Sequence, residues 1–288
     1  MKLLQKVATA IATTAALSIV SVPVMAFTVT QNNNGSDLLN SLLGDAKGLS
    51  NFSVTTKGNA SAFGLFSGNP FGLESGIALS SGKVADIPGV NSSSVYNPDL
   101  STSFGTPGDT PGSYDLAQLD ISFDADSTAE KVFFQYVFGS EEFVEYGGSN
   151  FNDSFELLLN GVNLAKLSDG QTVSINNLVP NPNGPYHTDY INNPAGPGTL
   201  TKLDGYTKTL TFEGLLNKNA SNTLSIKIKD VADSAYDSAV FLKGGTLGTV
   251  NPEAVPEPGT VLGLLALGAM GAGSIRKRKQ QEKVTVKA

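Results

Sequence analysis

The chain has 288 residues, which is long enough for one large all-β domain between two terminal targeting segments. Charged residues make up 16% of it, below the ~25% that is usual for soluble domains, and Gly, Ser, Thr and Asn take their place. Residues 27–258 carry 25 acids and 11 lysines, a net charge of −14 that argues against nucleic acid as a partner, and the absence of cysteine excludes disulfides and thiolate metal sites.

The first 26 residues have the parts of a secretory signal peptide. Two lysines precede an apolar stretch at residues 7–22, and a Val-Met-Ala sequence then ends at Ala26. Signal peptidase reads small residues at these last positions, so cleavage after Ala26 is expected. An uncleaved anchor is disfavoured, because the stretch is short and contains Thr and Ser.

Residues 36–43 are expected to form a short helix. Ser36 can cap it, Asp37 suits its first turn, and four leucines between residues 38 and 43 make one apolar face. Gly44 can end it.

The rest of the body has the pattern of strands. Apolar and polar residues alternate at 119–123, 155–159 and 224–228, whereas 132–138 and 239–242 are apolar on both faces. Alternation predicts half-buried strands, and a doubly apolar run predicts a central one. Asn160-Gly161 offers a hairpin turn. We therefore expect an all-β fold over residues 27–247, an antiparallel β-sandwich of jelly-roll type with one short N-terminal helix.

Two long segments, 84–115 and 179–199, are rich in Pro, Gly, Asn and Ser. Loops of this length are uncommon unless they bind something or move, so binding or mobility is the expectation for both. Residues 248–255 are the expected linker to the C-terminal tail.

Three segments gather acids with Asn and Ser at the ends of predicted strands. They are 138–146, 150–155 and 230–241. Clustered carboxylates in a poorly solvated place need a cation or many hydrogen bonds, and calcium accepts irregular sets of oxygen ligands. The predicted ligands are Glu141, Asp153 and Asp237, followed by Glu142, Asn152, Asp230 and Asp233.

An alternative interpretation of these acids stays open. Asp, Asn and Ser also cap turns by accepting backbone N–H groups, and the spacing matches no EF-hand loop. Neighbouring residues on a regular strand face opposite ways, so Glu141 and Glu142 cannot share one site there.

The C-terminal end contains a helix breaker, an apolar segment and a basic cluster in that order. Pro256-Glu257-Pro258 is a rigid break, and residues 259–275 are uncharged and just long enough to span a bilayer. The basic cluster consists of Arg276, Lys277, Arg278 and Lys279. This order predicts a transmembrane helix at 259–275 and a cytoplasmic tail at 280–288.

The segment 256–279 resembles the PEP-CTERM sorting signal in its motif, helix and basic cluster. The resemblance implies export in a bacterium with a double envelope and transient anchoring in the inner membrane. It also implies processing by an exosortase-type enzyme, delivery to the outer surface or the extracellular space, and a link to exopolysaccharide and biofilm.

The body is similar to the choice-of-anchor L domain. The resemblance rests on Phe-Gly-Ser-Glu-Glu-Phe at 138–143, Asn-Asp-Ser-Phe at 152–155 and Asp-Ser-Ala-Val-Phe-Leu at 237–242. The stretches 75–82 and 230–233 are similar to further parts of that family. The family brings no established activity.

We therefore expect an exported surface or matrix protein that is not an enzyme. It would be a calcium-stabilised binding or structural module, with polysaccharide as a possible partner. The alternative is a carbohydrate-active hydrolase that uses loop carboxylates, for which Glu141 or Glu142 would need a second acid at Asp153 or Asp237.

Overall fold

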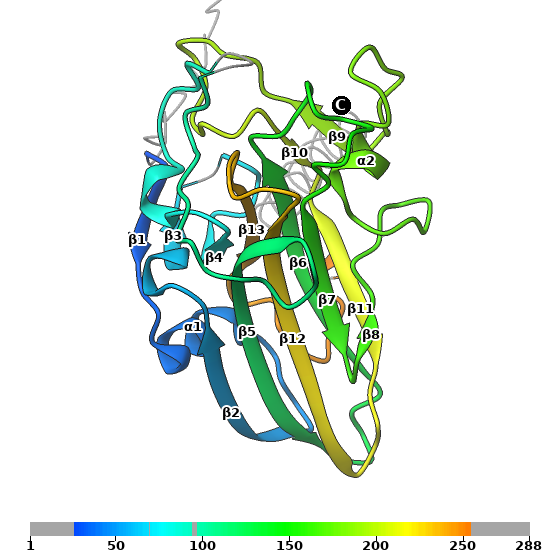
Figure 1. Ribbon diagram of the computed structural model, residues 1–288. Coiled ribbons are helices and arrows are strands. Elements are labelled where there is room, and N and C mark those ends of the chain that lie inside the picture. Colours follow the sequence, from blue (N-terminus) through cyan, green and yellow to red (C-terminus); the bar gives the residue numbers. More distant parts are fainter. Residues whose placement is uncertain (1–25, 69, 94–96, 255–288) are drawn as a thin grey trace, which may run out of the picture.

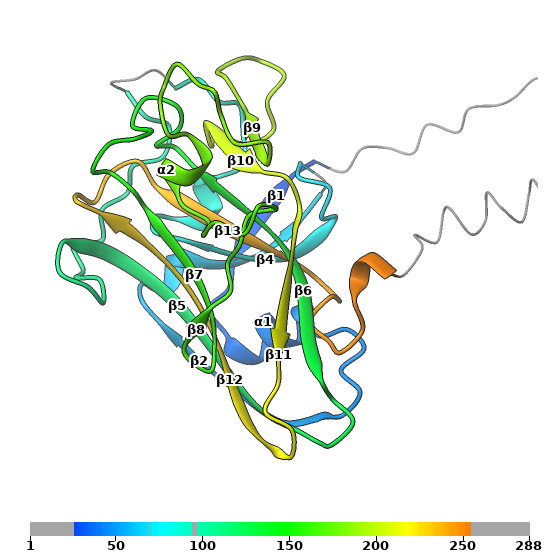
Figure 2. The ribbon, with the colours of Figure 1, turned by 90° about the vertical axis from the view of Figure 1, so that its right-hand side faces the viewer.

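The described chain is an antiparallel β-sandwich (Figure 1, Figure 2). The computed structural model describes residues 26–68, 70–93 and 97–254. The predicted signal segment before Ala26, the sorting segment 256–279 and its helix lie outside the described residues. Within the described ranges, no helix is long and apolar enough to cross a membrane.

The first sheet has eight strands in the order β1-β3-β4-β13-β6-β10-β9, and β11 also pairs with β6. Its strands are β1 Thr28–Gln31, β3 Phe63–Ser67, β4 Ser75–Ser80, β6 Lys131–Ser140, β9 Tyr190–Asn192, β10 Gly205–Thr207, β11 Leu210–Leu215 and β13 Ser238–Lys243. The second sheet has five strands in the order β2-β5-β12-β7-β8. These are β2 Leu49–Lys57, β5 Ser113–Ala125, β7 Ser154–Leu159, β8 Val162–Asn163 and β12 Ala220–Val231.

Strand alternation places two hydrophobic clusters on opposite sides of the first sheet. On β6, Tyr136 and Phe138 point into the cluster between the sheets, and Val137 points into the outer cluster. On β13, Val240 belongs to the inner cluster and Phe241 to the outer one. The prediction that β6 is central and buried on both faces is confirmed.

The outer cluster shows what the long segments do. Val84, Ile87 and Leu100 from the first segment are buried in it, so much of this segment packs as a cover over the first sheet. The segments are also not wholly irregular: short 3-10 helix η2 (Val84–Asp86) lies in the first, and β9 lies in the second. Both clusters draw on residues 27–247, so a chain of residues 26–254 contains this whole core and is expected to fold by itself.

Helix α1 spans Gly35–Leu42 and packs its leucines into the inner cluster. The expected cap at Ser36 is wrong: the side chain of Asn34 accepts the N–H groups of Ser36 and Asp37. The helix therefore starts one residue earlier than expected. A second short helix, α2, covers Ile175–Leu178, and 3-10 helices η1 (Ala60–Ala62) and η3 (Pro252–Ala254) complete the elements.

The hairpin after β7 has its turn at the two residues where the sequence predicts it. Asn160 and Gly161 both have positive φ, 51° and 84°, as the tight turn into β8 requires.

A second local feature ties the two ends of the domain together. The segment from Gly245 to Thr249 runs beside residues 41–45, with Gly44 N donating to Leu247 O at 2.9 Å and Thr249 N donating to Asp45 O at 2.8 Å.

Candidate functional site: a carboxylate cluster at one end of the sandwich

The five stretches singled out in the sequence meet around the start of β13. Ser238 N donates to Ser81 Oγ at 2.9 Å, and Ser238 Oγ lies 2.8 Å from Ser140 Oγ. The same hydroxyl donates to Asp153 Oδ2 at 2.6 Å. Val231 N, at the end of β12, donates to Asp153 Oδ1 at 3.0 Å. Strands β4, β6, β7, β12 and β13 thus all bring polar residues to one place.

Pairing between strands explains why these residues share a side. Ser238 stands opposite Ser140 in the β13–β6 pair. On β12 and β7, Ile228 pairs with Phe155, and both point between the sheets. Two residues further along lie Asp230 and Asp153, which continue the same inward face. The hydrophobic inner cluster therefore ends in a polar layer.

Two acids in this layer are buried with little or no hydrogen bonding. Glu142 is 1% exposed and Asp230 is 0% exposed. Both carboxylate oxygens of Glu142 lack a hydrogen-bond partner within the described part of the chain. Those of Asp230 have none in ordinary hydrogen-bond geometry, although the Ser81 hydroxyl lies near enough to lower its pKa. We call Glu142, Asp153 and Asp230 the inner acids. A buried carboxylate without a partner is costly, so the inner acids need a proton or a cation.

Burial and mutual repulsion act on all three inner acids. Burial, followed by the charges of Asp153 and Asp233, raises the pKa of Glu142 to about 10. Burial also raises the pKa of Asp153 to about 7, although the hydrogen bond from Ser238 opposes it. The pKa of Asp230 lies well above its usual value, first through burial and then through the charge of Asp153.

The other two leading candidates lie against a different segment. Glu141 precedes Glu142 in the bend that follows β6, and its Oε1 accepts the N–H of Asp99 at 2.6 Å. Asp237 accepts the N–H of Thr102 at 2.9 Å. Both partners belong to the segment that covers the outer face. The structure therefore brings Asp153 together with Glu142 and Asp230, while Glu141 and Asp237 hold the covering segment.

These two acids are also perturbed. Burial, followed by the charge of Asp204, raises the pKa of Glu141 to about 8. Burial raises the pKa of Asp237 to about 7, with Asp115 contributing in the same direction. Hydrogen bonds from backbone N–H groups satisfy part of each carboxylate, which matches the alternative interpretation of these acids as loop caps.

The remaining two predicted ligands serve the turns. Asn152 Oδ1 accepts the N–H of Asn176 at 2.9 Å, and Asp233 Oδ1 accepts the N–H of Ala235 at 3.1 Å. Across residues 26–68, 70–93 and 97–254, no three Asp, Glu or His side chains stand in a ready-made arrangement for a metal ion.

Sequence reasoning missed the hydroxyl groups and two further acids of this region. Ser81, Ser140 and Ser238 were inside the quoted stretches, but serine is too common for its spacing to be informative. Asp99 and Asp204 lie in loop sequences with no motif, and only the fold brings them near Glu141.

A partly exposed acid in the loop before β5, beside the second sheet, has a different environment. Asp109 Oδ1 is 2.5 Å from Lys229 Nζ, and its Oδ2 is 2.9 Å from Lys227 Nζ. Burial alone would raise the pKa of Asp109, but hydrogen bonds and charges from both lysines outweigh it and lower the pKa to about 2.

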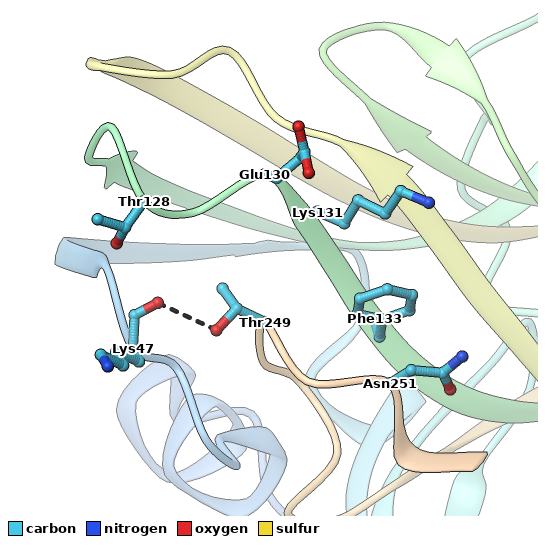
Figure 3. A pocket seen from close by; sticks show the side chains of 7 residues that line it. All are labelled: Lys47, Thr128, Glu130, Lys131, Phe133, Thr249 and Asn251. Carbon is cyan, nitrogen blue, oxygen red and sulfur yellow. Dashed lines mark hydrogen bonds between the residues drawn. The ribbon is translucent and has the colours of Figure 1, made fainter. Parts of the chain in front are cut away.

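An open hollow of about 510 Å³ lies elsewhere, beside the last described residues (Figure 3). Its charged lining is mixed, and both Glu130 and Lys131 have partners, Lys218 and Glu213 respectively. Thr249 Oγ1 donates to the carbonyl oxygen of Lys47 at 3.0 Å across one side of it. Because Glu130 and Lys131 are already paired, their charges give no reason to assign a ligand to this hollow.

Two family models match the chain. The Choice-of-anchor L domain covers residues 27–248, and the PEP-CTERM protein-sorting motif covers residues 254–279. No curated protein matches it. The sorting motif indicates an exported protein that is directed to the cell surface and processed by an exosortase-type enzyme. By its body and its tail, the chain belongs to the choice-of-anchor L domain family and is one of the exported proteins that carry a PEP-CTERM sorting motif.

Proposed function

We propose that the protein is a calcium-stabilised module of the cell surface or extracellular matrix, with a binding or structural role and no catalytic activity. The observation that supports it is the pair of buried acids Glu142 and Asp230: within the described chain Glu142 has no hydrogen-bond partner, and the Ser81 hydroxyl is the group that acts on the Asp230 carboxylate as a donor. Asp153 lies beside them and has hydrogen bonds from Ser238 and Val231.

Calcium suits this place for chemical reasons. It binds carboxylate and hydroxyl or carbonyl oxygens in irregular sets, and it neutralises the negative charges that otherwise repel one another. The inner acids stand between two sheets, where a cation would join strands β6, β7 and β12. Since the present arrangement is not a ready-made metal site, binding requires Glu142 and Asp230 to close on the ion.

The test is the thermal unfolding of residues 26–254 with calcium and with EDTA, together with calorimetric titration. Calcium at about 100 times Kd should raise Tm by about 5–10 °C, because a ligand that binds only the folded state stabilises it. The double variant Glu142→Gln/Asp230→Asn should lose this response. Asp124→Asn, at the opposite end of β5, should keep it.

A Tm that is indifferent to both calcium and EDTA would overturn the calcium part of the proposal. The inner acids would then be neutralised by protons. An equal response in the wild type and the double variant would place any calcium site elsewhere.

The proposed surface role adds a final location to the sorting that the PEP-CTERM motif indicates. In this proposal the tail anchors the protein in the inner membrane transiently, and the processed protein joins an exopolysaccharide-rich matrix or biofilm. Replacing Pro256-Glu257-Pro258 by Ala-Ala-Ala in the producing cell should retain the protein in the membrane fraction. Retention of polysaccharide by the purified domain would indicate a binding role, and its absence a structural one.

A further inference from the structure

The last residues that the structure describes lie against the first sheet. Gly248 and Phe133 exchange two backbone hydrogen bonds of 3.1 and 2.8 Å, and η3 then contacts β6 (Figure 2). Close to the end of this stretch, Thr211 Oγ1 on β11 donates to Glu253 Oε1 at 2.5 Å. We call residues 250–254 the latch, because they hold the end of the described chain on β6 and β11.

The sorting signal starts within the latch. The PEP-CTERM motif covers residues 254–279, so its first residue is also the last residue of η3. Pro256 follows Glu253 by three positions, and an extended chain advances at most about 3.6 Å per residue. While Glu253 is bonded to Thr211, Pro256-Glu257-Pro258 therefore begins within roughly 11 Å of the Glu253 backbone.

This short distance conflicts with the way in which a peptide chain is commonly bound. A bound peptide lies extended in a groove, where its backbone pairs with the partner and its side chains enter pockets on alternate sides. Residues in a 3-10 helix that contacts β6 cannot pair in this way, and the sandwich stands beside them. We expect the processing enzyme to bind the start of the signal only after the latch has left the sheet.

The latch is held weakly enough to leave while the domain stays folded. Leu247 is the last residue in the described ranges that belongs to a hydrophobic cluster, and Val250 is 44% exposed. The hydrogen bond between Thr211 and Glu253 is exposed to solvent. Segments with few buried apolar contacts open locally at a fraction of the free energy of global unfolding.

We propose that the latch must leave β6 and β11 before the exosortase-type enzyme can process the tail, and that the hydrogen bond between Thr211 and Glu253 sets the fraction of molecules in which it is free. When opening and closing are fast, the rate of processing follows this open fraction. The proposal rests on the processing that the sorting motif indicates, and it depends on neither calcium nor the final location of the protein.

The test is pulse-labelling of the full chain in the producing cell, with electrophoresis to follow the conversion of the tailed form to the processed form. Thr211→Val removes the donor and keeps the branched shape of the side chain. It should speed conversion about two- to fivefold, which is the effect of losing one exposed hydrogen bond on the opening equilibrium. Thr223→Val is the matched control: its hydroxyl lies 3.3 Å from Ser122 Oγ on the second sheet, and conversion should keep the wild-type rate.

An insertion separates the latch from the signal. Six Gly and Ser residues placed after Ala254 let the motif extend roughly 20 Å further from the body while the latch stays in place. The insertion should speed conversion at least as much as Thr211→Val does. In the inserted chain, Thr211→Val should have no further effect, because the enzyme then reaches the signal without opening the latch.

Hydrogen exchange of purified residues 26–254 gives a readout without the enzyme. Thr211→Val should speed exchange of the Glu253 amide about two- to fivefold and leave the core strands unchanged. Equal conversion rates for the wild type and Thr211→Val, an insertion without effect, or faster exchange throughout the domain would overturn the proposal. The sorting assignment is tested separately, because replacing Pro256-Glu257-Pro258 should stop conversion whether or not the latch controls its rate.

Discussion

Asp109 and the inner acids show two environments of a carboxylate, one partly exposed and paired with lysines and one fully buried among other acids. Asp109 is placed between Lys227 and Lys229, and its pKa falls to about 2. Among the described residues, the charges that act on Glu142 are the negative ones of Asp153, Asp233 and Glu145, and burial together with these charges raises its pKa to about 10. Lysines thus neutralise the acid on the outside of β12. In contrast, none of the described charges that act on Glu142 is positive.

The difference lies along a single strand. Lys227 and Lys229 point out of β12 toward Asp109, and the next residue, Asp230, points between the sheets. A register shift between Ile228 and Asp230 marks the point where β12 changes its pairing with β5. Ion pairs with Lys227 and Lys229 neutralise the acid on the outer side, whereas no positive side chain of the described ranges pairs with the inner acids. This contrast is the reason to look for an external cation at the inner acids.

The largest expected effect comes from disturbing the packing around the acids. A Cβ at Gly82 would lie 1.8 Å from Asp237 Oδ2, so Gly82→Ala must displace a buried carboxylate from its bond with Thr102. We expect a loss of about 3 kcal/mol in the free energy of unfolding, measured by urea denaturation. Gly198→Ala has open space and should change stability by less than about 0.5 kcal/mol. Equal effects would mean that the acids near β13 are loosely held and solvated.

The second prediction is a mutation that stabilises the folded protein, whereas most mutations destabilise it. In EDTA, Glu142→Gln should raise the free energy of unfolding by about 1–2 kcal/mol at pH 8, because Glu142, with a pKa of about 10 in the folded state, must take up a proton on folding and the amide need not. Glu156→Gln should stay within about 0.5 kcal/mol. Chemical denaturation of the metal-free protein measures both. A clear destabilisation by Glu142→Gln would show that the carboxylate already has a partner that we have not identified.

The smallest effect is expected at the paired acid. Asp109→Asn should destabilise the protein by about 1 kcal/mol at pH 7, since the ion pairs are partly exposed and screened. The lowered pKa in the folded state means that this stability is present above pH 3.8 and is lost as the pH falls toward 2. The difference between wild type and variant should therefore shrink over that interval. A constant difference would assign the loss to packing rather than charge.

Much of the fold follows from local sequence patterns. The alternation in β5, β7 and β12, the doubly apolar β6 and the Asn160-Gly161 turn correspond to strands and a hairpin in the structure. These features depend on neighbours along the chain, which a sequence displays directly. The cap at Asn34 was missed because Ser36 is an equally good capping residue two positions away.

The candidate site was only partly predictable. The sequence identified the acids and the strand ends that carry them, but not which acids face the same way. That depends on strand pairing, such as Ser140 opposite Ser238, and on the shift in register before Asp230. Asp204 comes near Glu141 only because β10 pairs with the end of β6. Such contacts between distant segments leave no local trace in composition or spacing.

The clasp between residues 245–249 and 41–45 has a mechanical consequence. Tension applied through the C-terminal tail first meets the bond from Thr211 on β11 to Glu253, and then this segment, where the bonds from Thr249 to Asp45 and from Gly44 to Leu247 take the load. Gly248 and Phe133 exchange two further backbone hydrogen bonds, so part of the force passes directly into β6. A protein tethered by its tail would thus be pulled at a reinforced point, and the polar end of the sandwich would remain unstretched until these bonds had broken.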